Sequence, residues 1–420
     1  MILEDEYKQR RDTLAKKLSK NSLAVIFSAS YKTRSNDTQY PFRQDSHFYY
    51  LTGFKEDNSV LMFVKKGKKV KTILFVYKKD KQEELWNGKR LGVKKAKERF
   101  LVDEVYLVNE FEIKLKKYLK DTHTLYYDFK TDGKNIQTLM QYSKDLYSYK
   151  NIAKDISLMR LIKSDAEIKL IKKAVSITKE AHHRVMKMDK VGKNEQEIQA
   201  ELEYVFKKNL AYSDAYTSIV ASGNSANTLH YISNNQQLKD GDLILIDAGC
   251  EFEYYASDIT RTISVNTHFT SAQKDIYNLV LEVEKEIISM VKPNVLRSDL
   301  HKKSEELLVD GMVKLGILKG KTKKLIKKQK HKVYYPHGIG HWMGLDVHDD
   351  CPYKDKKDKE IVLQKGMVLT IEPALYFDKD DKSIPKKYRG IGIRIEDDIL
   401  VTEDGFENLS IDIIKELDRL

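Results

Sequence analysis

The stretch that decides the fold runs from Gly241 to Arg261 and reads GDLILIDAGCEFEYYASDITR. An apolar run, Leu243 to Ile246, leads into Asp247, and Asp258 follows eleven residues later. Short apolar segments separated by turn residues are typical of paired β-strands. We therefore expect two strands joined by a short turn, with one aspartate on each strand.

The two aspartates set a chemical problem for such a pair of strands. Side chains alternate along a strand, so Asp258, Thr260 and Thr262 are expected on one face. An acid at the end of an apolar strand is costly to bury without a partner, and neighbouring acids repel each other. Hard divalent cations prefer carboxylate oxygens. The more specific hypothesis is therefore that the two aspartates bind metal. The alternative is that both are solvated at the ends of their strands.

Three later stretches carry further ligand-type residues. They are PHGIGHWMGLDVHD from Pro336 to Asp349, MVLTIEP from Met367 to Pro373, and GIGIRIEDD from Gly390 to Asp398. In the last two, hydrophobic residues alternate with polar ones, so we expect Glu372 on one strand, and Arg394 and Glu396 together on one face of another. One histidine and four carboxylates suit a two-metal hydrolytic site with ions about 3.5–4 Å apart.

These residues carry a resemblance to a known family. The metallopeptidases with the creatinase/methionine-aminopeptidase, or pita-bread, fold have a ligand set similar in kind and order to Asp247, Asp258, His341, Glu372 and Glu396. The sequence motifs around these residues are most similar to those of aminopeptidase P, the Xaa-Pro aminopeptidase. The resemblance covers nearly the whole chain. It implies an α+β protein with a smaller α/β N-terminal domain of the creatinase type at 1–155. The pita-bread catalytic domain, a curved antiparallel sheet with two helix pairs, is expected at 156–420.

The resemblance implies a role for each ligand residue. Asp258 and Glu396 would bridge two metal ions, His341 and Glu372 would complete one site, and Asp247 would chelate the other. A water or hydroxide between the ions would be the nucleophile, and Glu372 would accept its proton. Manganese is the usual metal of the family, and zinc and cobalt are alternatives for such a ligand set.

The resemblance also implies residues that handle the substrate. His337 and His348 would flank the scissile peptide, one holding the substrate and the other stabilising the oxyanion. His230 would line the pocket, and Arg394 would clamp a ligand carboxylate. Further matched positions are Tyr353 and Arg160, which would complete the pocket, and Trp86, which is either a partly buried aromatic residue or part of an entrance shared between subunits.

Local patterns predict the elements that carry these residues. An N-terminal helix is expected within residues 1–20, and strands are expected at 22–28, 60–64, 72–76, 104–108 and 124–127. Ser164 and Glu167 form a capping-box pattern, which predicts a helix start at Ser164. Further helices are expected from near Asn194, at 274–292 and at 298–315, which would complete two helix pairs.

Composition narrows the class of protein. A chain of 420 residues is long for one core, which predicts two domains. No run approaches eighteen apolar residues, and the acidic N-terminus lacks the apolar region of a signal peptide. Cys250 and Cys351 are too few for a disulfide framework and are interpreted as small apolar filler. We therefore expect a cytoplasmic protein without a membrane partner.

The formal net charge is +12, and eight of the fourteen residues from Lys319 to Lys332 are lysine. No aromatic residue interrupts that run and no nucleic-acid motif surrounds it, so a solvated helix-and-loop face is expected there instead of a nucleic-acid site. The partners implied by the resemblance are peptides with proline at the second position and other copies of the chain, as a dimer or tetramer.

Other interpretations of the same site stay open. Prolidase, a close relative, cleaves only Xaa-Pro dipeptides, and Gly340 before His341 is shared with many prolidases. Trp342 and the motifs GLDVH and YRGIG are more similar to aminopeptidase P. Ala374 is a mild departure, because the family commonly has glycine at this position. A creatinase-like amidinohydrolase is a further alternative. A non-catalytic pita-bread binding protein is more remote, because all five ligand residues are present.

Overall fold

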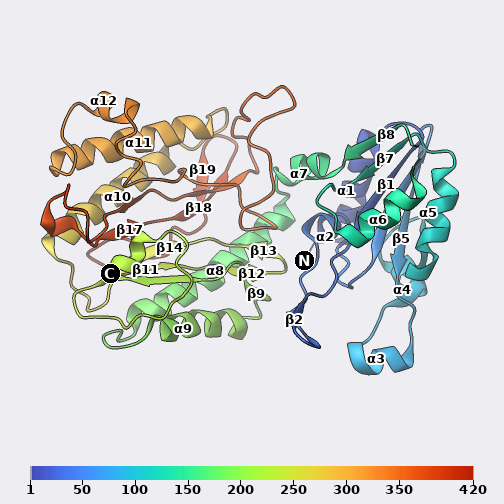
Figure 1. Ribbon diagram of the computed structural model, residues 1–420, viewed down its shortest axis with the longest axis horizontal. Helices are drawn as coiled ribbons and strands as arrows, with labels where there is room; N and C mark the ends of the chain where they lie inside the picture. The colour runs from blue at the N-terminus through green and yellow to red at the C-terminus, as the bar shows by residue number, and fades with distance from the viewer. Residues whose placement is uncertain (1, 145, 420) are drawn as a thin grey trace. The chain divides into compact units, whose positions relative to one another are not determined.

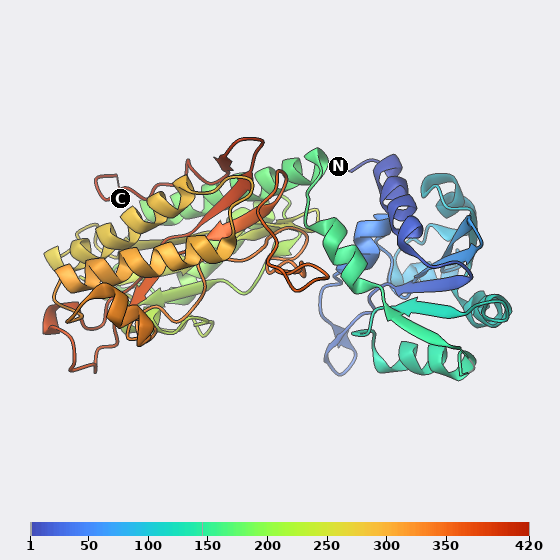
Figure 2. The same ribbon diagram turned by 90° about the horizontal axis from the view of Figure 1, so that it is seen from above.

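The computed structural model describes residues 2–144 and 146–419. The chain divides into two compact units, the first ending at Arg160 and the second beginning at Leu161. Helix α7 (Ala153–Arg160) therefore belongs to the first unit, and the domain boundary expected at 155/156 lies inside this helix. Figures 1 and 2 show the elements of each unit in two views. Within the described residues, no helix has the length and apolar character required to cross a bilayer.

The first unit is built on a six-stranded mixed sheet. Its strands are β1 (Ser22–Phe27), β4 (Val60–Lys66), β5 (Lys69–Val76), β6 (Glu104–Leu107), β7 (Thr124–Tyr127) and β8 (Ser148–Asn151). The strand order is β6-β5-β4-β1-β7-β8, with β1, β4 and β5 antiparallel and the outer strands added in parallel. Strands β4 and β5 are longer than the expected strands 60–64 and 72–76, and each extends further toward the turn that joins them. The turn is short because Gly67 adopts a left-handed φ of +58°.

Helices pack on this sheet through apolar side chains. On one face Phe111, Leu115 and Leu139, from α5 (Phe111–Leu119) and α6 (Gly133–Tyr142), share a buried cluster with Val25 and Met62 of the sheet. The unit's other elements are α1 (Glu4–Lys17), α2 (Ser46–Thr52), α3 (Lys81–Asn87), α4 (Gly92–Arg99), the ribbon β2 (Thr33–Ser35) and β3 (Thr38–Gln39), and the 3-10 turn η1 (Val108–Glu110). The strands and helices expected here are thus present.

Two helix pairs dominate the second unit. They are α8 (Asp165–Lys187) with α9 (Glu195–Lys208), and α10 (Ser271–Ser289) with α11 (Arg297–Lys314). The capping box expected at Ser164 is confirmed, because its hydroxyl accepts the N–H of Glu167 and the Glu167 carboxylate accepts the N–H of Ser164. The lysine-rich stretch forms α12 (Thr322–Lys327) and flanking turns, and its lysines from 319 to 330 are exposed.

The strands of the second unit form four small antiparallel sheets. In chain order they are β9 (Ser213–Asp214), β10 (Ile219–Ser222), β11 (Leu243–Asp247), β12 (Cys250–Phe252), β13 (Tyr255–Ala256), β14 (Thr260–Ser264), β15 (Val368–Ile371), β16 (Ala374–Tyr376), β17 (Gly392–Arg394), β18 (Asp397–Val401) and β19 (Phe406–Asn408), with 3-10 turns η2 (Gly223–Asn227) and η3 (Lys386–Tyr388). The sheets are β10-β11-β14, β13-β12-β9, β15-β18-β19 and β16-β17.

The expectation of two strands joined by a short turn between Gly241 and Arg261 was wrong. Strands β11 and β14 do pair, but a second hairpin, β12 with β13, is inserted between them. Glu253 and Tyr254 form its tight turn with positive φ angles of 49° and 70°. Asp258 therefore lies two residues before β14 and not on that strand.

Each helix pair covers its own group of strands. Ala181 of α8 and Ile198 of α9 share a buried cluster with Ile246 of β11, and a separate cluster joins α10 and α11 to β15–β18. The two halves meet where the N–H of Glu396 donates to the carbonyl of Thr260 at 3.1 Å. Figure 1 shows the two helix pairs on opposite sides of the strands of this unit. The α+β architecture with paired helices on antiparallel sheet is as expected.

Candidate active site

The expected carboxylate ligands all lie where a strand ends or breaks. Asp247 is the last residue of β11, and Asp258 stands just before β14. Glu372 lies between β15 and β16, and Glu396 lies between β17 and β18. At these points the regular alternation of side chains is interrupted, so carboxylates from four segments turn toward one point at the junction of the two halves.

Asp247 and Asp258 meet at the phenol of Tyr216. The Tyr216 hydroxyl lies 2.5 Å from Oδ1 of Asp247 and 2.6 Å from Oδ1 of Asp258. The chain can bring the two acids together because Gly249 has no side chain. A Cβ at Gly249 would lie 1.8 Å from the carbonyl oxygen of Ser257, the residue that precedes Asp258. A single hydroxyl proton cannot satisfy both carboxylates, so the pair retains a need for positive charge.

His341 reaches the cluster from the loop before β15. Its Nδ1 donates to the carbonyl of Trp342 at 3.1 Å, which leaves Nε2 free to act as a ligand. This Nε2 lies 3.3 Å from Oδ2 of Asp258 and 3.8 Å from Oε1 of Glu372. Gly340 permits the approach, because a Cβ there would lie 1.9 Å from the carbonyl oxygen of Thr370 on β15.

Among the described residues, three overlapping groups have ligand atoms within 4.8 Å of one another. They are Asp247 with Asp258 and Glu396, His341 with Glu372 and Glu396, and Asp258 with His341 and His348. The first two groups share Glu396 and together contain all five expected ligands. The third includes His348, which the sequence assigned to the substrate.

The electrostatics of this cluster fit a divalent metal. Burial, together with the charge of the neighbouring carboxylates, raises the pKa of Asp258 and of Glu396. Burial also raises the pKa of Glu372 to about 7, although His341 and Arg394 act in the opposite direction. Such shifts mean that the acids cannot all be ionised side by side without added positive charge. Oxygen-rich ligands with one imidazole supply suitable donors for that charge in the form of metal ions.

A cavity of about 230 Å³ opens onto the cluster. It is lined by Leu229, His230, Asp247, Asp258, His337, Gly338, Gly340, His341, His348, Glu372, Arg394 and Glu396. The structure thus brings together the five ligand candidates and the three histidines expected to handle substrate. His230 reaches the cavity from a turn after η2.

The two histidines beside the ligands are held as neutral imidazoles. Nδ1 of His337 donates to the carbonyl of Gly338 at 2.8 Å, and its Nε2 accepts from the Tyr376 hydroxyl at 3.1 Å. Burial and the nearby Arg394 lower the pKa of His337 to about 4. The ring of His348 lies 4.0 Å from that of His341, and burial together with His341 lowers the pKa of His348 to about 4.

Arg394 is positioned as a clamp on Asp247. Its Nη2 lies 2.5 Å from Oδ2 of Asp247, Nη1 donates to the Tyr376 hydroxyl at 2.8 Å, and Nε donates to Oγ1 of Thr260 at 3.1 Å. The hydroxyl of Thr260 in turn donates to Oε2 of Glu396 at 2.7 Å. The guanidinium therefore connects ligand residues from both halves of the unit.

Three expected site residues lie outside the cavity lining just described. Tyr353 stacks on Trp342, with ring centroids 5.6 Å apart, and the guanidinium carbon of Arg297 lies 4.4 Å from the centroid of the Tyr353 ring. Arg160 belongs to the first unit, where Nη1 lies 3.1 Å from Nδ1 of His47. Trp86 lies on α3 with 86% of its surface exposed, so the interpretation as a partly buried aromatic was wrong. Roles in catalysis for these three stay predictions.

Two tyrosines in the site were not predicted from the sequence. Tyr216 follows β9 in an irregular segment, where no periodicity marks it. Tyr376 had a weak signal, because it ends β16, four residues after Glu372, in a strand that pairs with the one carrying Arg394. Thr260 was expected on one strand face with Asp258, and its hydrogen bond to Glu396 was not predicted.

Comparisons with known proteins agree with this geometry. The sequence profile of metallopeptidase family M24 matches residues 169–403, and that of the aminopeptidase P N-terminal domain matches residues 7–126. A Xaa-Pro aminopeptidase from Haemophilus influenzae is 40% identical over 98% of this chain and 95% of its own length. The solved structure of proline aminopeptidase P II from Yersinia pestis superimposes with a TM-score of 0.96 at 37% identity, covering 100% of this chain and 98% of that one. The zinc-substituted aminopeptidase P of E. coli in complex with product gives 0.95 at 37% identity, covering 100% and 97%.

A cavity lined by four carboxylates and histidines, inside a catalytic unit of paired helices on antiparallel strands, defines a metal-dependent hydrolase. The chain belongs to metallopeptidase family M24. Its two units have the fold of aminopeptidase P, in which the N-terminal domain precedes the pita-bread catalytic domain.

Proposed function

We propose that this metallopeptidase removes the N-terminal residue from peptides whose second residue is proline. The observation that carries the proposal is the convergence of Asp247, Asp258, His341, Glu372 and Glu396 on one cavity. The relative from Haemophilus influenzae, which bears the name Xaa-Pro aminopeptidase, supports the substrate class.

The five ligand residues would hold two divalent metal ions, with Asp258 and Glu396 shared between them. Bound there, the ions would supply Lewis-acid activation of the attacking water. Mn²⁺ is our first choice, because four carboxylates and one imidazole form an oxygen-rich set. Zinc is a second choice, supported by the zinc-substituted E. coli relative, and cobalt is a third.

Glu372 is the proposed proton acceptor for the attacking water. Its Oε1 lies 3.8 Å from Nε2 of His341 and its Oε2 lies 3.7 Å from Nδ1 of His337, so the carboxylate faces both the ligand cluster and the proposed substrate side. A carboxylate placed in this way can pass the proton on to the proline nitrogen as the peptide bond breaks. This transfer converts an amide nitrogen into a neutral amine leaving group.

The histidines that line the cavity are proposed to bind the peptide around its scissile bond. His348 would donate a hydrogen bond to the oxyanion, which its neutral imidazole can do without a change of charge. His337, fixed by Tyr376 and Gly338, and His230 on the neighbouring turn would line the substrate pocket. Arg394 would keep the carboxylate of Asp247 oriented.

Selectivity for proline follows from its backbone. Proline has no N–H and a fixed φ, so a pocket shaped for its ring leaves no donor unpaired. An ordinary residue at the second position would bring an N–H that needs a partner. The free N-terminal amine of the peptide is expected to bind near Asp247. Binding there would place the first peptide bond of the substrate at the site of cleavage.

The experiment that tests the proposal compares three peptides at the same metal loading. We expect kcat/KM for Gly-Pro-Ala to exceed that for Gly-Pro by at least about tenfold, or about 1.4 kcal/mol. N-acetyl-Gly-Pro-Ala should be cleaved more slowly than the free tripeptide, because acetylation removes a charge-assisted contact of roughly 1.5–3 kcal/mol. Stripping the metal should abolish cleavage and Mn²⁺ should restore it. Cleavage of Gly-Pro without Gly-Pro-Ala would identify a prolidase instead.

We also propose a cytoplasmic enzyme that works as a homodimer or homotetramer. Both cysteines are buried and neither forms a disulfide, which suits a reducing compartment. Trp86, which is exposed in the single chain, is proposed to line an entrance shared between subunits. Light scattering on the purified protein measures the number of subunits directly.

A further inference from the structure

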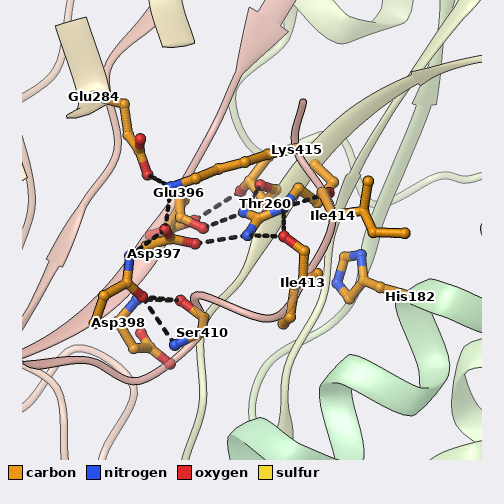
Figure 3. Close-up of polar contacts among 12 residues, drawn as sticks. His182, Thr260, Glu284, Glu396, Asp397, Asp398, Ser410, Ile413, Ile414 and Lys415 are labelled. Carbon is orange, nitrogen blue, oxygen red and sulfur yellow. Dashed lines mark hydrogen bonds and ion pairs between the residues drawn. The ribbon is translucent and has the colours of Figure 1, made fainter. Parts of the chain in front are cut away.

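The C-terminal segment 410–415 packs directly behind the metal site. Figure 3 shows Ser410, Ile413, Ile414 and Lys415 beside the chain at Glu396 and the two aspartates that follow it. The proposed reaction uses none of these C-terminal residues. Their contacts nevertheless reach the backbone of both carboxylates proposed to be shared by the metal ions.

Arg261 connects the segment to Glu396. Its Nη1 donates to the carbonyl oxygen of Glu396 at 2.7 Å and to that of Thr260 at 2.9 Å. Its Nη2 donates to the carbonyl oxygen of Ile413 at 3.0 Å, and its Nε donates to that of Ile414 at 3.1 Å. Because Arg261 is fully buried, these carbonyl oxygens take the place of the water molecules that would hydrate an exposed guanidinium. The C-terminal segment thus holds the Arg261 guanidinium in place, and the guanidinium in turn holds the backbone carbonyl of Glu396.

Lys415 strengthens the same connection through Asp397. Its Nζ lies 2.5 Å from Oδ2 of Asp397 and 2.5 Å from Oε1 of Glu284 on α10 (Figure 3). The other carboxylate oxygen of Asp397 accepts from Nη2 of Arg261 at 2.6 Å. Asp397, the residue next to Glu396, therefore contacts a basic side chain through each carboxylate oxygen. The side chains of Asp397, Arg261, Lys415 and Glu284 are all buried.

A second branch of contacts reaches Asp258. The hydroxyl oxygen of Ser410 accepts the backbone N–H of Asp398 at 3.1 Å. The carboxylate of Asp398 accepts the backbone N–H of Asp258 at 3.1 Å. The segment 410–415 therefore reaches Glu396 through Arg261 and reaches Asp258 through Asp398.

A buried ion network is a poor device for stability alone. Each charge loses its water, and well-packed apolar side chains of similar volume often fold as well or better. Such a network is more useful where groups must be held in a fixed geometry, as carboxylates around two metal ions must be. None of Arg261, Lys415 and Ser410 lines the cavity, so their influence on it passes through the backbone of other residues.

We propose that the segment 410–415, acting through Arg261, Lys415 and Ser410, is a positioning element that holds Asp258 and Glu396 at the spacing the metal ions require. The inference rests on the proposed function only in taking these two carboxylates as shared metal ligands. Arg261, Lys415 and Ser410 are positioning residues, because they touch no substrate. Their loss weakens metal binding and leaves the peptide pocket intact.

The test is the variant K415M, with K285M as its matched control. Lys285 also pairs with the C-terminal region, through Glu416 at 3.2 Å, but that pair is exposed. Mn²⁺ titrations of stripped protein should show a tenfold to hundredfold weaker affinity in K415M, the range typical for outer partners of metal ligands, and wild-type affinity in K285M. At saturating Mn²⁺, KM for Gly-Pro-Ala should stay within about twofold of wild type, while kcat is lowered. Wild-type Mn²⁺ affinity and kcat in K415M would overturn the proposal.

Two further variants keep the test decisive if K415M does not fold, as judged by far-UV circular dichroism. K415M/E284Q also replaces the carboxyl group that Lys415 contacts. S410A removes the acceptor for the Asp398 N–H and the donor to Oδ1 of Asn408. Both should be folded and bind Mn²⁺ more weakly than K285M, with the smaller loss in S410A. Wild-type affinity in both would also overturn the proposal. Because the titration involves no peptide, failure of wild-type protein to cleave Gly-Pro-Ala would remove the proposed substrate without affecting this result.

Discussion

Nη2 of Arg394 lies 2.5 Å from Oδ2 of Asp247, which ties β17 to the end of β11 across the junction of the two helix-pair halves. The other guanidinium nitrogens are held by Tyr376 and Thr260, so the group has little freedom to turn. Its charge therefore fixes one oxygen of Asp247 and leaves Oδ1 directed at Tyr216. A planar fork of donors suits this task better than a single ammonium group.

Replacing Arg394 should therefore weaken the metal site. We expect R394Q to lose about tenfold to a hundredfold in Mn²⁺ affinity or in kcat/KM, as is typical when an outer partner of a metal ligand is removed. R394K should fall between R394Q and wild type, because it restores the charge without the fork. R184Q, which removes an exposed arginine on α8, is the control. Equal activity in R394Q and R184Q would contradict the clamp.

Local sequence patterns predicted much of the framework. The capping box at Ser164 and Glu167 and the helix start after Asn194 were correct, because caps depend on residues only three apart. The apolar runs of β11 and β15 were also correct, since each is buried and short. These features are fixed by neighbours along the chain.

Features that depend on distant contacts escaped prediction. The β12–β13 hairpin was missed, since its tight turn uses positive φ at Glu253 and Tyr254 and contains no glycine. The strand breaks at Glu372 and Glu396 were read as continuous strands, because alternation of apolar and polar residues persists through them. Tyr216 was missed because its partners lie 31 and 42 residues away.

Glu372 is expected to be essential for turnover. E372Q keeps the size of the side chain but removes the proton acceptor and one ligand charge, so kcat should fall nearly to background. The fold should survive, since the half-buried side chain lies at the cavity and not in an apolar core. Thermal unfolding of stripped protein and single-turnover cleavage of Gly-Pro-Ala measure the two effects. E403Q, at an exposed ion pair with Lys365, is the control, and turnover in E372Q like that in E403Q would refute the role.

His348 is expected to contribute through the oxyanion. H348A should reduce kcat by roughly 10²–10³, the usual loss for one such donor. Because His348 also stands within 4.8 Å of Asp258 and His341, Mn²⁺ affinity must be measured alongside. Unchanged affinity with reduced kcat supports the donor role, whereas a parallel loss of affinity would make His348 a ligand. H268A, at an exposed histidine near Asn266, is the control and should behave as wild type.

The pH dependence of stability should report Glu284. Burial, together with the charge of Asp397, raises its pKa from 4.5 to about 8, against the opposing effect of Lys415. The folded protein then holds a proton that the unfolded chain releases between about pH 4.5 and 8, so the free energy of unfolding falls as pH rises through this window. E284Q cannot ionise and should lack this component. Urea unfolding in chelator at pH 5.5, 7 and 8.5 measures it, and parallel profiles for the two proteins would contradict the shift.

Tyr216 offers the sharpest distinction between the protein with and without metal. Without metal its hydroxyl is the donor that separates Asp247 from Asp258, at 2.5 and 2.6 Å. With metal bound, positive charge takes over that task. The hydroxyl should therefore matter more to the metal-free protein, where its loss leaves Oδ1 of Asp247 and Oδ1 of Asp258 without their shared donor.

Y216F is accordingly expected to destabilise stripped protein by about 1–3 kcal/mol, the usual penalty for leaving a buried polar group without its partner. The metal-loaded protein should lose less. Because ligand stabilisation equals RT ln(1 + [L]/Kd), the rise in Tm on adding saturating Mn²⁺ should then be larger in Y216F than in wild type. Y204F, at a half-exposed tyrosine on α9, should leave that rise unchanged. If Tyr216 instead supported the carboxylates while they hold metal, Y216F would bind Mn²⁺ more weakly and the rise in Tm would shrink, so the sign of this one difference decides between the two roles.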